Sequence, residues 1–68
     1  MIQELLNIID NIVKSGYDVA DRTTIARWFD HSDQELTATI NIAIKQGLIT
    51  KSGNIYNLTY EGAKKISR

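Results

Sequence analysis

The sequence contains no cysteine and no proline, and it has only four glycines among its 68 residues. Without cysteine there are no disulfides and no thiolate metal ligands, so packed apolar side chains must stabilise the fold. We expect a chain of this length to form one domain, residues 1–68, and to bury only about 60% of its unfolded surface. These absences favour a small domain of a reducing compartment such as the cytoplasm, with little interior for an enzyme cleft.

Long apolar runs and an excess of one charge are also absent. Apolar runs such as Leu5-Leu6 and Trp28-Phe29 are far shorter than the ~20 residues needed to cross a bilayer, so no membrane span is expected. Eight Lys and Arg balance eight Asp and Glu, with a pI near 6.5. No strong overall field therefore draws the chain to nucleic acid or to anionic lipid.

The first fifteen residues have the spacing of an amphipathic helix. Six apolar side chains recur at intervals of three and four residues: Ile2, Leu5, Leu6, Ile9, Ile12 and Val13. This pattern predicts a helix over residues 2–15 with those side chains in the core. Gly16 follows, and glycine adopts the left-handed conformation that ends many helices.

A second, shorter helix is expected over residues 22–29, after a short extended segment at residues 17–19. Asp21 is the expected N-cap, with Thr23 or Thr24 as alternatives. A helix of two turns is marginal alone in water, so an apolar face must pack it on its neighbours. The residues expected on that face, and so in the core, are Ile25, Ala26, Trp28 and Phe29.

The third helix has the clearest start signal. Ser32-Asp33-Gln34-Glu35 matches a capping box, in which the serine hydroxyl and the glutamate carboxylate satisfy amides at the helix start. Gly47 stands where a glycine ends a helix, so the helix is predicted over residues 33–46. Its expected core side chains are Leu36, Ile40, Ala43 and Ile44.

From Leu48 the apolar spacing changes to that of strands. Two short antiparallel strands are predicted within residues 48–58, because Gly53-Asn54 can hold the positive φ angles of a tight hairpin turn. Thr59 is then the expected cap of a last helix over residues 60–67. Ala63 and Ile66 are expected to face inward, Tyr56 and Tyr60 to brace the hairpin against the first helix, and Lys64, Lys65 and Arg68 to lie at the C-terminal end.

This order of elements resembles the winged helix-turn-helix superfamily, and local residues strengthen the resemblance. Residues 24–26 look like the start of the first helix of a helix-turn-helix, where a small residue allows close crossing, and residues 33–46 look like the recognition helix. Residues 46–49 are similar to the Gly-Leu-Ile signature before the wing, and residues 56–62 to the Leu-Thr-x-x-Gly signature after it in small bacterial regulators. The resemblance implies an α+β, mostly α fold: a three-helix core, a two-stranded wing and a short C-terminal helix.

The resemblance further implies duplex DNA as partner, with the third helix in the major groove and the hairpin on the flanking backbone. The candidate contact residues are Gln34, Thr37, Asn41, Lys45 and Lys51. The two amides match adenine, the threonine matches a thymine methyl or a phosphate, and the lysines match phosphates. A solvated helix face is the alternative interpretation of the three polar residues.

The charge of this region limits DNA affinity. Residues 21–58 hold four cations and four anions, and two of the anions, Asp33 and Glu35, stand where the recognition helix begins. Phosphate contacts supply much of the affinity of such modules, so a homodimer is expected if DNA is the ligand.

A second hypothesis follows from two apolar residues on the same helix face. Ala38 and Ile42 form a small apolar strip where a DNA reader keeps polar side chains. This strip favours a winged-helix adaptor that binds protein, or a second copy of the chain, in place of DNA.

An enzyme is the weakest hypothesis. His31 has Asp30 and Asp33 nearby, but the sequence has no second histidine and no cysteine, so a polar loop explains these residues better than a metal site. No nucleophile and base pair or glycine-rich phosphate loop can be assembled. We expect no catalytic residue, no metal and no cofactor.

Overall fold

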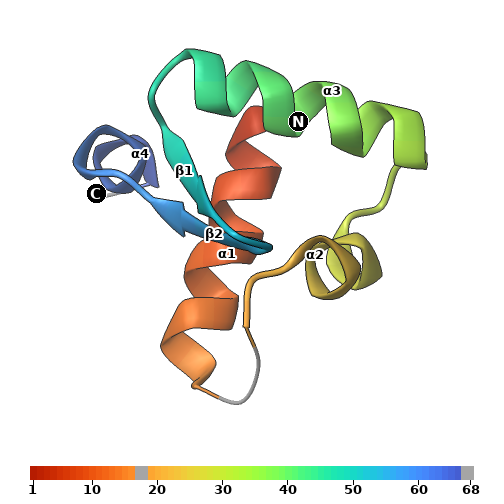
Figure 1. Cartoon of the computed structure of the whole chain (residues 1–68), viewed down its shortest axis with the longest axis horizontal. Helices are drawn as coiled ribbons and strands as arrows, with labels where there is room; N and C mark the ends of the chain where they lie inside the picture. The colour runs from red at the N-terminus through yellow and green to blue at the C-terminus, as the bar shows by residue number, and fades with distance from the viewer. Residues whose placement is uncertain (17–18, 67–68) are drawn as a thin grey trace.

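The computed structural model describes residues 1–16 and 19–66. In chain order the elements of these residues are α1 (Ile2–Ser15), α2 (Arg22–Trp28), α3 (Asp33–Lys45), β1 (Ile49–Ser52), β2 (Ile55–Leu58) and α4 (Tyr60–Ile66). The predicted α+β, mostly helical class is confirmed, and the layout in Figure 1 is consistent with a winged helix. Expectations for residues 17–18, for Ser67 and for Arg68 lie outside the described residues.

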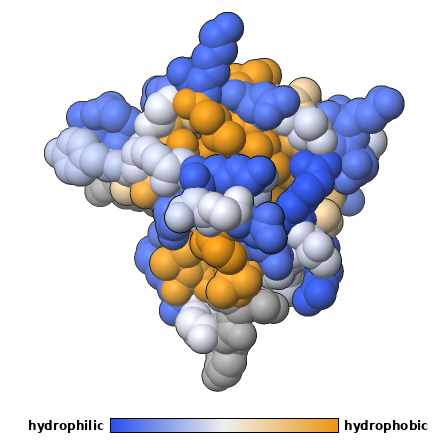
Figure 2. All heavy atoms as spheres, viewed as in Figure 1, coloured by the Kyte–Doolittle hydropathy of each residue, from blue (hydrophilic) through white to orange (hydrophobic). Residues whose placement is uncertain are grey.

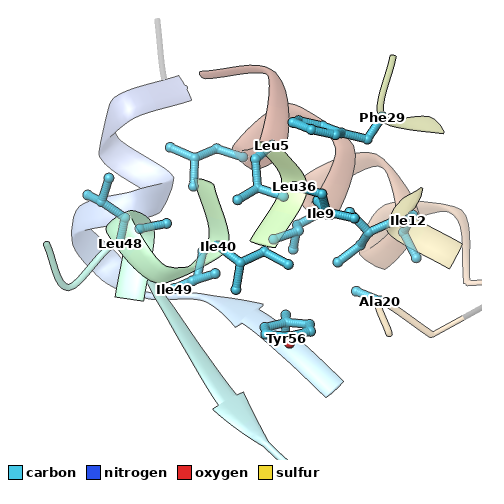
Figure 3. Close-up of a cluster of buried hydrophobic side chains, with 13 residues drawn as sticks. Leu5, Ile9, Ile12, Ala20, Phe29, Leu36, Ile40, Leu48, Ile49 and Tyr56 are labelled. Atoms are coloured by element: carbon cyan, nitrogen blue, oxygen red, sulfur yellow. The ribbon is translucent and has the colours of Figure 1, made fainter. Parts of the chain in front are cut away.

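The first helix lies at the centre of the fold. α1 packs against α2, α3, β2 and α4, and its buried side chains are Leu5, Leu6, Ile9 and Ile12. Figure 3 shows side chains from the other elements gathered around them. These buried partners are Ala20, Ile25, Phe29, Leu36, Ile40, Ala43, Leu48, Ile49 and Tyr56. Full burial of a large apolar side chain contributes about 1.5–3 kcal/mol, so this one cluster supplies the main stabilisation of a chain without disulfides.

Local signals at the helix ends act as the sequence predicts. Gly16 follows α1 in the left-handed conformation, with φ 71°. The Asp21 carboxylate caps α2 by accepting from the Thr24 amide at 2.8 Å, so Asp21 and neither threonine is the cap. Ser32 and Glu35 form the complete capping box at the start of α3.

The third helix ends at a glycine, as expected. Gln46, predicted as the last helical residue, is the C-cap, and Gly47 follows with φ 74°. The Gly47 amide donates to the Ile44 carbonyl at 3.0 Å, and the Leu48 amide donates to the Ala43 carbonyl at 2.9 Å. This pair of bonds is a Schellman motif, which turns the chain sharply from α3 into the hairpin.

The hairpin pairs β1 with β2 in antiparallel register, with Ile49 opposite Leu58 and Ser52 opposite Ile55. In its two-residue turn only Gly53 has a positive φ, 62°, so the expectation of positive φ for Asn54 is wrong. This pattern is that of a type II′ turn, which requires positive φ at the first turn residue alone. An isolated bridge also joins Ile55 to Asp21, so the start of α2 lies beside the turn end of the hairpin.

Several side chains predicted to be buried are exposed instead. The sequence pattern is wrong in this respect for Val13, Ala26, Trp28, Ile44 and Ala63. Ile25 of α2 and its C-cap Phe29 pack in the core, and Trp28 is left 66% exposed. Ala26, expected to allow a close helix crossing, faces solvent. Tyr56 is buried as part of the core, whereas Tyr60 is 78% exposed and does not brace the hairpin.

Two threonines are buried that the apolar pattern did not select. Thr24 is 5% exposed and Thr39 is 3% exposed. The Thr39 hydroxyl donates to the Glu35 carbonyl at 2.7 Å, one turn back in α3. A buried hydroxyl with a backbone partner of this kind avoids the cost of an unsatisfied polar group.

Candidate nucleic-acid interface

One face of α3 is exposed in the part of the chain that the structure describes. Its opposite face is buried through Leu36, Thr39, Ile40 and Ala43. The exposed residues recur at intervals of three, four and seven positions, which places them on one side of the helix: Gln34, Thr37, Ala38, Asn41 and Lys45. Four of the five candidate DNA contacts therefore share one exposed surface, which we call the outer face of α3.

Two isoleucines border the outer face. At ~100° per residue, Ile42 and Ile44 fall on its opposite edges. Ile42 is 46% exposed and Ile44 is 39% exposed. Ala38 and Ile42 thus have the exposure that the protein-binding hypothesis requires, and the outer face is polar along its middle and apolar at its edges.

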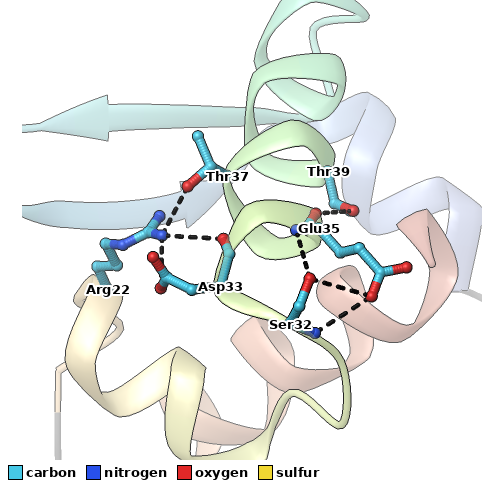
Figure 4. A network of polar contacts seen from close by, with 6 residues as sticks. All are labelled: Arg22, Ser32, Asp33, Glu35, Thr37 and Thr39. Carbon is cyan, nitrogen blue, oxygen red and sulfur yellow. Dashed lines mark hydrogen bonds and ion pairs between the residues drawn. The ribbon is translucent and has the colours of Figure 1, made fainter.

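A network of polar contacts joins the start of α2 to the N-terminal end of the outer face. The Arg22 guanidinium, on the first residue of α2, donates through Nη2 to the Asp33 carboxylate at 2.8 Å and to the Thr37 hydroxyl at 2.6 Å. The same nitrogen lies 3.3 Å from the Asp33 carbonyl oxygen. Figure 4 shows Arg22, Asp33 and Thr37 together on one side of α3. We call these three residues the Arg22 network.

The acidic residues at the start of α3 point in different directions. Asp33 pairs with Arg22, and its side chain is 80% exposed. Glu35 accepts from the Ser32 amide and hydroxyl, both at 3.2 Å, and lies on the side of α3 away from Arg22 in Figure 4. Of these two acidic residues, Asp33 is the one that places negative charge beside Thr37, and the Arg22 guanidinium already faces it.

The two candidate lysines lie on different elements. Lys45 stands in the last turn of α3, and its side chain makes no hydrogen bond or ion pair with residues 1–16 or 19–66. Lys51 is exposed on β1, with Nζ 5.9 Å from the centre of the Tyr56 ring. The structure shows no direct contact that brings these lysines together.

Arg22 contacts this surface, although the sequence did not select it as a candidate. A local signal exists, because an N-cap at Asp21 fixes Arg22 in the first turn of α2. Its contacts with Asp33 and Thr37 span 11 and 15 residues. Contacts of that range follow from how α2 and α3 pack, which the local pattern does not report.

A second surface feature lies between α1 and α2. It is a groove of about 490 Å³ lined by Ile8, Asn11, Ile12, Ser15, Thr24, Arg27 and Trp28. The exposed Trp28 ring forms part of its wall. On the face drawn in Figure 2, the apolar surface forms separate areas that hydrophilic side chains divide.

His31 serves a structural contact in the part of the chain that is described. Its Nε2 lies 2.9 Å from Glu4 Oε1, which joins the loop before α3 to α1. The His31 side chain and the Asp30 amide both favour the carboxylate form, and they lower the pKa of Glu4. Within residues 1–16 and 19–66, no group of His, Asp and Glu residues could hold a metal ion, and no helix is long and apolar enough to cross a membrane.

Comparisons with known proteins give no independent assignment. No family model matches the chain, and neither a curated protein nor a solved structure matches it.

Proposed function

We propose that this protein is a winged-helix regulator of transcription that binds duplex DNA in the cytoplasm as a homodimer. The outer face of α3 would enter the major groove, and the hairpin would contact the flanking backbone. The observation that carries this proposal is the exposed polar middle of α3, formed by Gln34, Thr37 and Asn41.

The size and chemistry of α3 support base contact. Thirteen residues make a rod of about 20 Å, and a helix fits the major groove of B-DNA. Amide side chains such as those of Gln34 and Asn41 can donate to and accept from the edge of adenine. Lys45 and Lys51 supply positive charge at the end of α3 and on the hairpin.

The charge balance supports a dimer. Within the described residues, the cations of the proposed DNA-binding elements and their neighbours are Lys45 on α3, Lys51 on the hairpin and the partly neutralised Arg22 at the start of α2. Because each phosphate contact adds about 0.9 to the salt dependence of log affinity, two or three contacts give a weak complex. A two-fold dimer doubles the contacts and reads two half-sites.

The test is fluorescence anisotropy with random and genomic duplexes between about 50 and about 200 mM salt, paired with light scattering for mass. Lys45→Ala and Lys51→Ala should each lower the salt slope by about one and weaken all sequences alike. Lys14→Ala is the matched control, because Lys14 pairs with Asp10 at 3.0 Å near the C-terminal end of α1. Affinity that is indifferent to salt and to both lysines contradicts the proposal.

A protein-binding adaptor is the second candidate, and two observations favour it. Ile42 is half exposed at the edge of α3, and Trp28 is exposed beside the groove between α1 and α2. Large aromatic side chains are common anchors of protein interfaces. In this case polar substitutions at Ile42 or Trp28 should change oligomeric mass or partner capture, while Lys45→Ala has no effect.

A further inference from the structure

The Arg22 side chain has hydrogen-bond donors left over. A guanidinium carries five N–H groups in a planar fork. The contacts to Asp33 and Thr37 all use one nitrogen, Nη2. The N–H groups of Nη1 and Nε find no acceptor in the described part of the chain, and the side chain is 38% exposed. Arg22 is thus fixed in position while part of its fork faces solvent.

The position of Arg22 suits a contact with the DNA backbone. The network ties Arg22 to the first two turns of α3, beside the outer face. The bridge between Asp21 and Ile55 sets the start of α2 next to the turn end of the hairpin. Arg22 therefore contacts the first turns of α3, while its neighbour Asp21 pairs with the turn end of the hairpin. An arginine fork matches two phosphate oxygens at once.

Asp33 opposes such a contact. Its exposed carboxylate occupies Nη2 and would stand close to any phosphate that approached the remaining donors. An ion pair this exposed contributes little stability in water, so a phosphate can compete with it. The charge of Asp33 would therefore affect DNA binding more than it affects the stability of the fold.

The Thr37 hydroxyl is a hydrogen-bond acceptor in the network. Its oxygen accepts an N–H from Arg22 at 2.6 Å. Within the described residues the Thr37 hydroxyl donates to no acceptor, so its hydrogen is available to one outside the chain. On the outer face that acceptor would be a phosphate oxygen or an acceptor atom of a base edge.

We infer that the Arg22 network is a phosphate-binding element of duplex DNA recognition whose strength Asp33 limits. The inference rests on the proposed DNA binding. Replacing Asp33 by its neutral isostere should leave an amide oxygen for Arg22 while removing the charge that repels phosphate.

The test compares Asp33→Asn with Asp10→Asn, which removes the same charge from an ion pair on α1. Asp33→Asn should tighten duplex binding about fivefold at low salt, as expected for one unit charge near a phosphate in water. The salt slope should steepen by up to about one. Asp10→Asn should change neither quantity.

A double variant separates the network from general electrostatics. In Asp33→Asn combined with Arg22→Gln, the gain relative to Arg22→Gln alone should disappear, because without the guanidinium no phosphate is held beside residue 33. A gain of the same size without Arg22 overturns the inference, as does an affinity for Asp33→Asn equal to or below that of the wild type. Circular dichroism of each variant checks that the fold is intact, and tighter binding by a slightly less stable protein cannot arise from lost structure.

The outcomes for the two proposals are distinguishable. If wild-type binding depends on salt, Lys45 and Lys51 but Asp33→Asn brings no gain, the network inference fails and the proposed function stands. If neither the wild type nor Asp33→Asn binds any duplex, both fail.

Discussion

Gly62 in α4 lies directly against the backbone of Leu48, so close that a Cβ atom on Gly62 would overlap the Leu48 carbonyl group. The Thr59 amide donates to the same carbonyl at 3.0 Å, and the Thr59 hydroxyl donates to the Gly47 carbonyl at 2.5 Å. α4 is therefore seated on the junction between α3 and the hairpin. The position of the hairpin relative to the outer face of α3 depends on this contact.

Gly62→Ala should destabilise the protein by about 1–3 kcal/mol, the usual cost of forcing a group into a filled site. The neighbour is backbone, which cannot move aside as a flexible side chain can. Urea denaturation followed by circular dichroism gives the measurement. Ala63→Ser, at the exposed neighbouring position, is the control and should stay within about 0.5 kcal/mol of the wild type. Equal midpoints for the two variants would show that the contact is loose in solution.

Gly47→Ala should cost about 1 kcal/mol, for a different reason. Gly47 has φ 74° and open space around its α carbon, so a methyl group meets no atom and only the left-handed backbone is penalised. The loss should appear as a lower urea midpoint with unchanged slope. A midpoint equal to that of the wild type contradicts the Schellman turn between α3 and the hairpin.

How far the sequence predicts this fold depends on the range of each contact. The caps at Ser32 and Gly47 depend on residues within one turn, and the sequence identifies both. Trp28 and Phe29 are adjacent and apolar, yet only Phe29 is buried. Which of them faces the core is decided by how α2 rests on α1, a contact between distant segments. Ile44 is exposed for a similar reason, because a helical spacing does not define the width of the buried face.

The candidate site divides in the same way. Gln34 and Asn41 share the outer face because they lie seven residues apart on one helix, which is close to two full turns. The sequence alone therefore places them together. Arg22 joins that surface through Asp33 and Thr37, across the turn between two helices. From the sequence, Asp33 is expected to be an unpaired anion at the start of the helix, whereas in the structure it pairs with Arg22.

The contact between Glu4 and His31 predicts a pH effect on stability. His31 and the Asp30 amide lower the pKa of Glu4 from its ordinary value of 4.5. A carboxyl with a lowered pKa stabilises the folded state above the unfolded value, and this stability is lost as pH falls through the folded value. Stability should therefore fall below about pH 4.5, and Glu4→Gln should remove this part of the fall.

Urea midpoints measured from about pH 3 to about pH 7 test the effect. Glu61→Gln on α4 is the control, since it removes an exposed carboxylate whose nearest cation, Lys64, is 4.0 Å away. The same acid dependence in Glu4→Gln and in the wild type would mean that the contact between α1 and the loop before α3 does not form in solution.

If duplex DNA is the ligand, Asn41→Ala should relax sequence preference and leave the salt slope unchanged. Asn41 lies in the middle of the outer face and carries no charge, and a good amide contact with adenine is worth about 1–3 kcal/mol of discrimination. Competition between genomic and random duplexes measures the preference. Lys45→Ala is the contrasting variant, because it should lower the salt slope and keep the preference. An Asn41→Ala variant with full preference would place base reading elsewhere.

Ile42→Asp separates the two candidate functions. Ile42 is 46% exposed at the edge of α3, so in a monomer the substitution should change stability by less than about 0.5 kcal/mol. If Ile42 anchors a protein partner or a second copy, burial of its side chain contributes about 1.5–3 kcal/mol, and a charged replacement should reduce the mass seen by light scattering. Trp28→Ser is the parallel variant for the groove between α1 and α2, on a different pair of helices. Unchanged mass and partner capture in both variants, with DNA binding retained, would contradict the adaptor hypothesis. A large fall in stability for Ile42→Asp alone would mean that this edge of α3 is covered in solution.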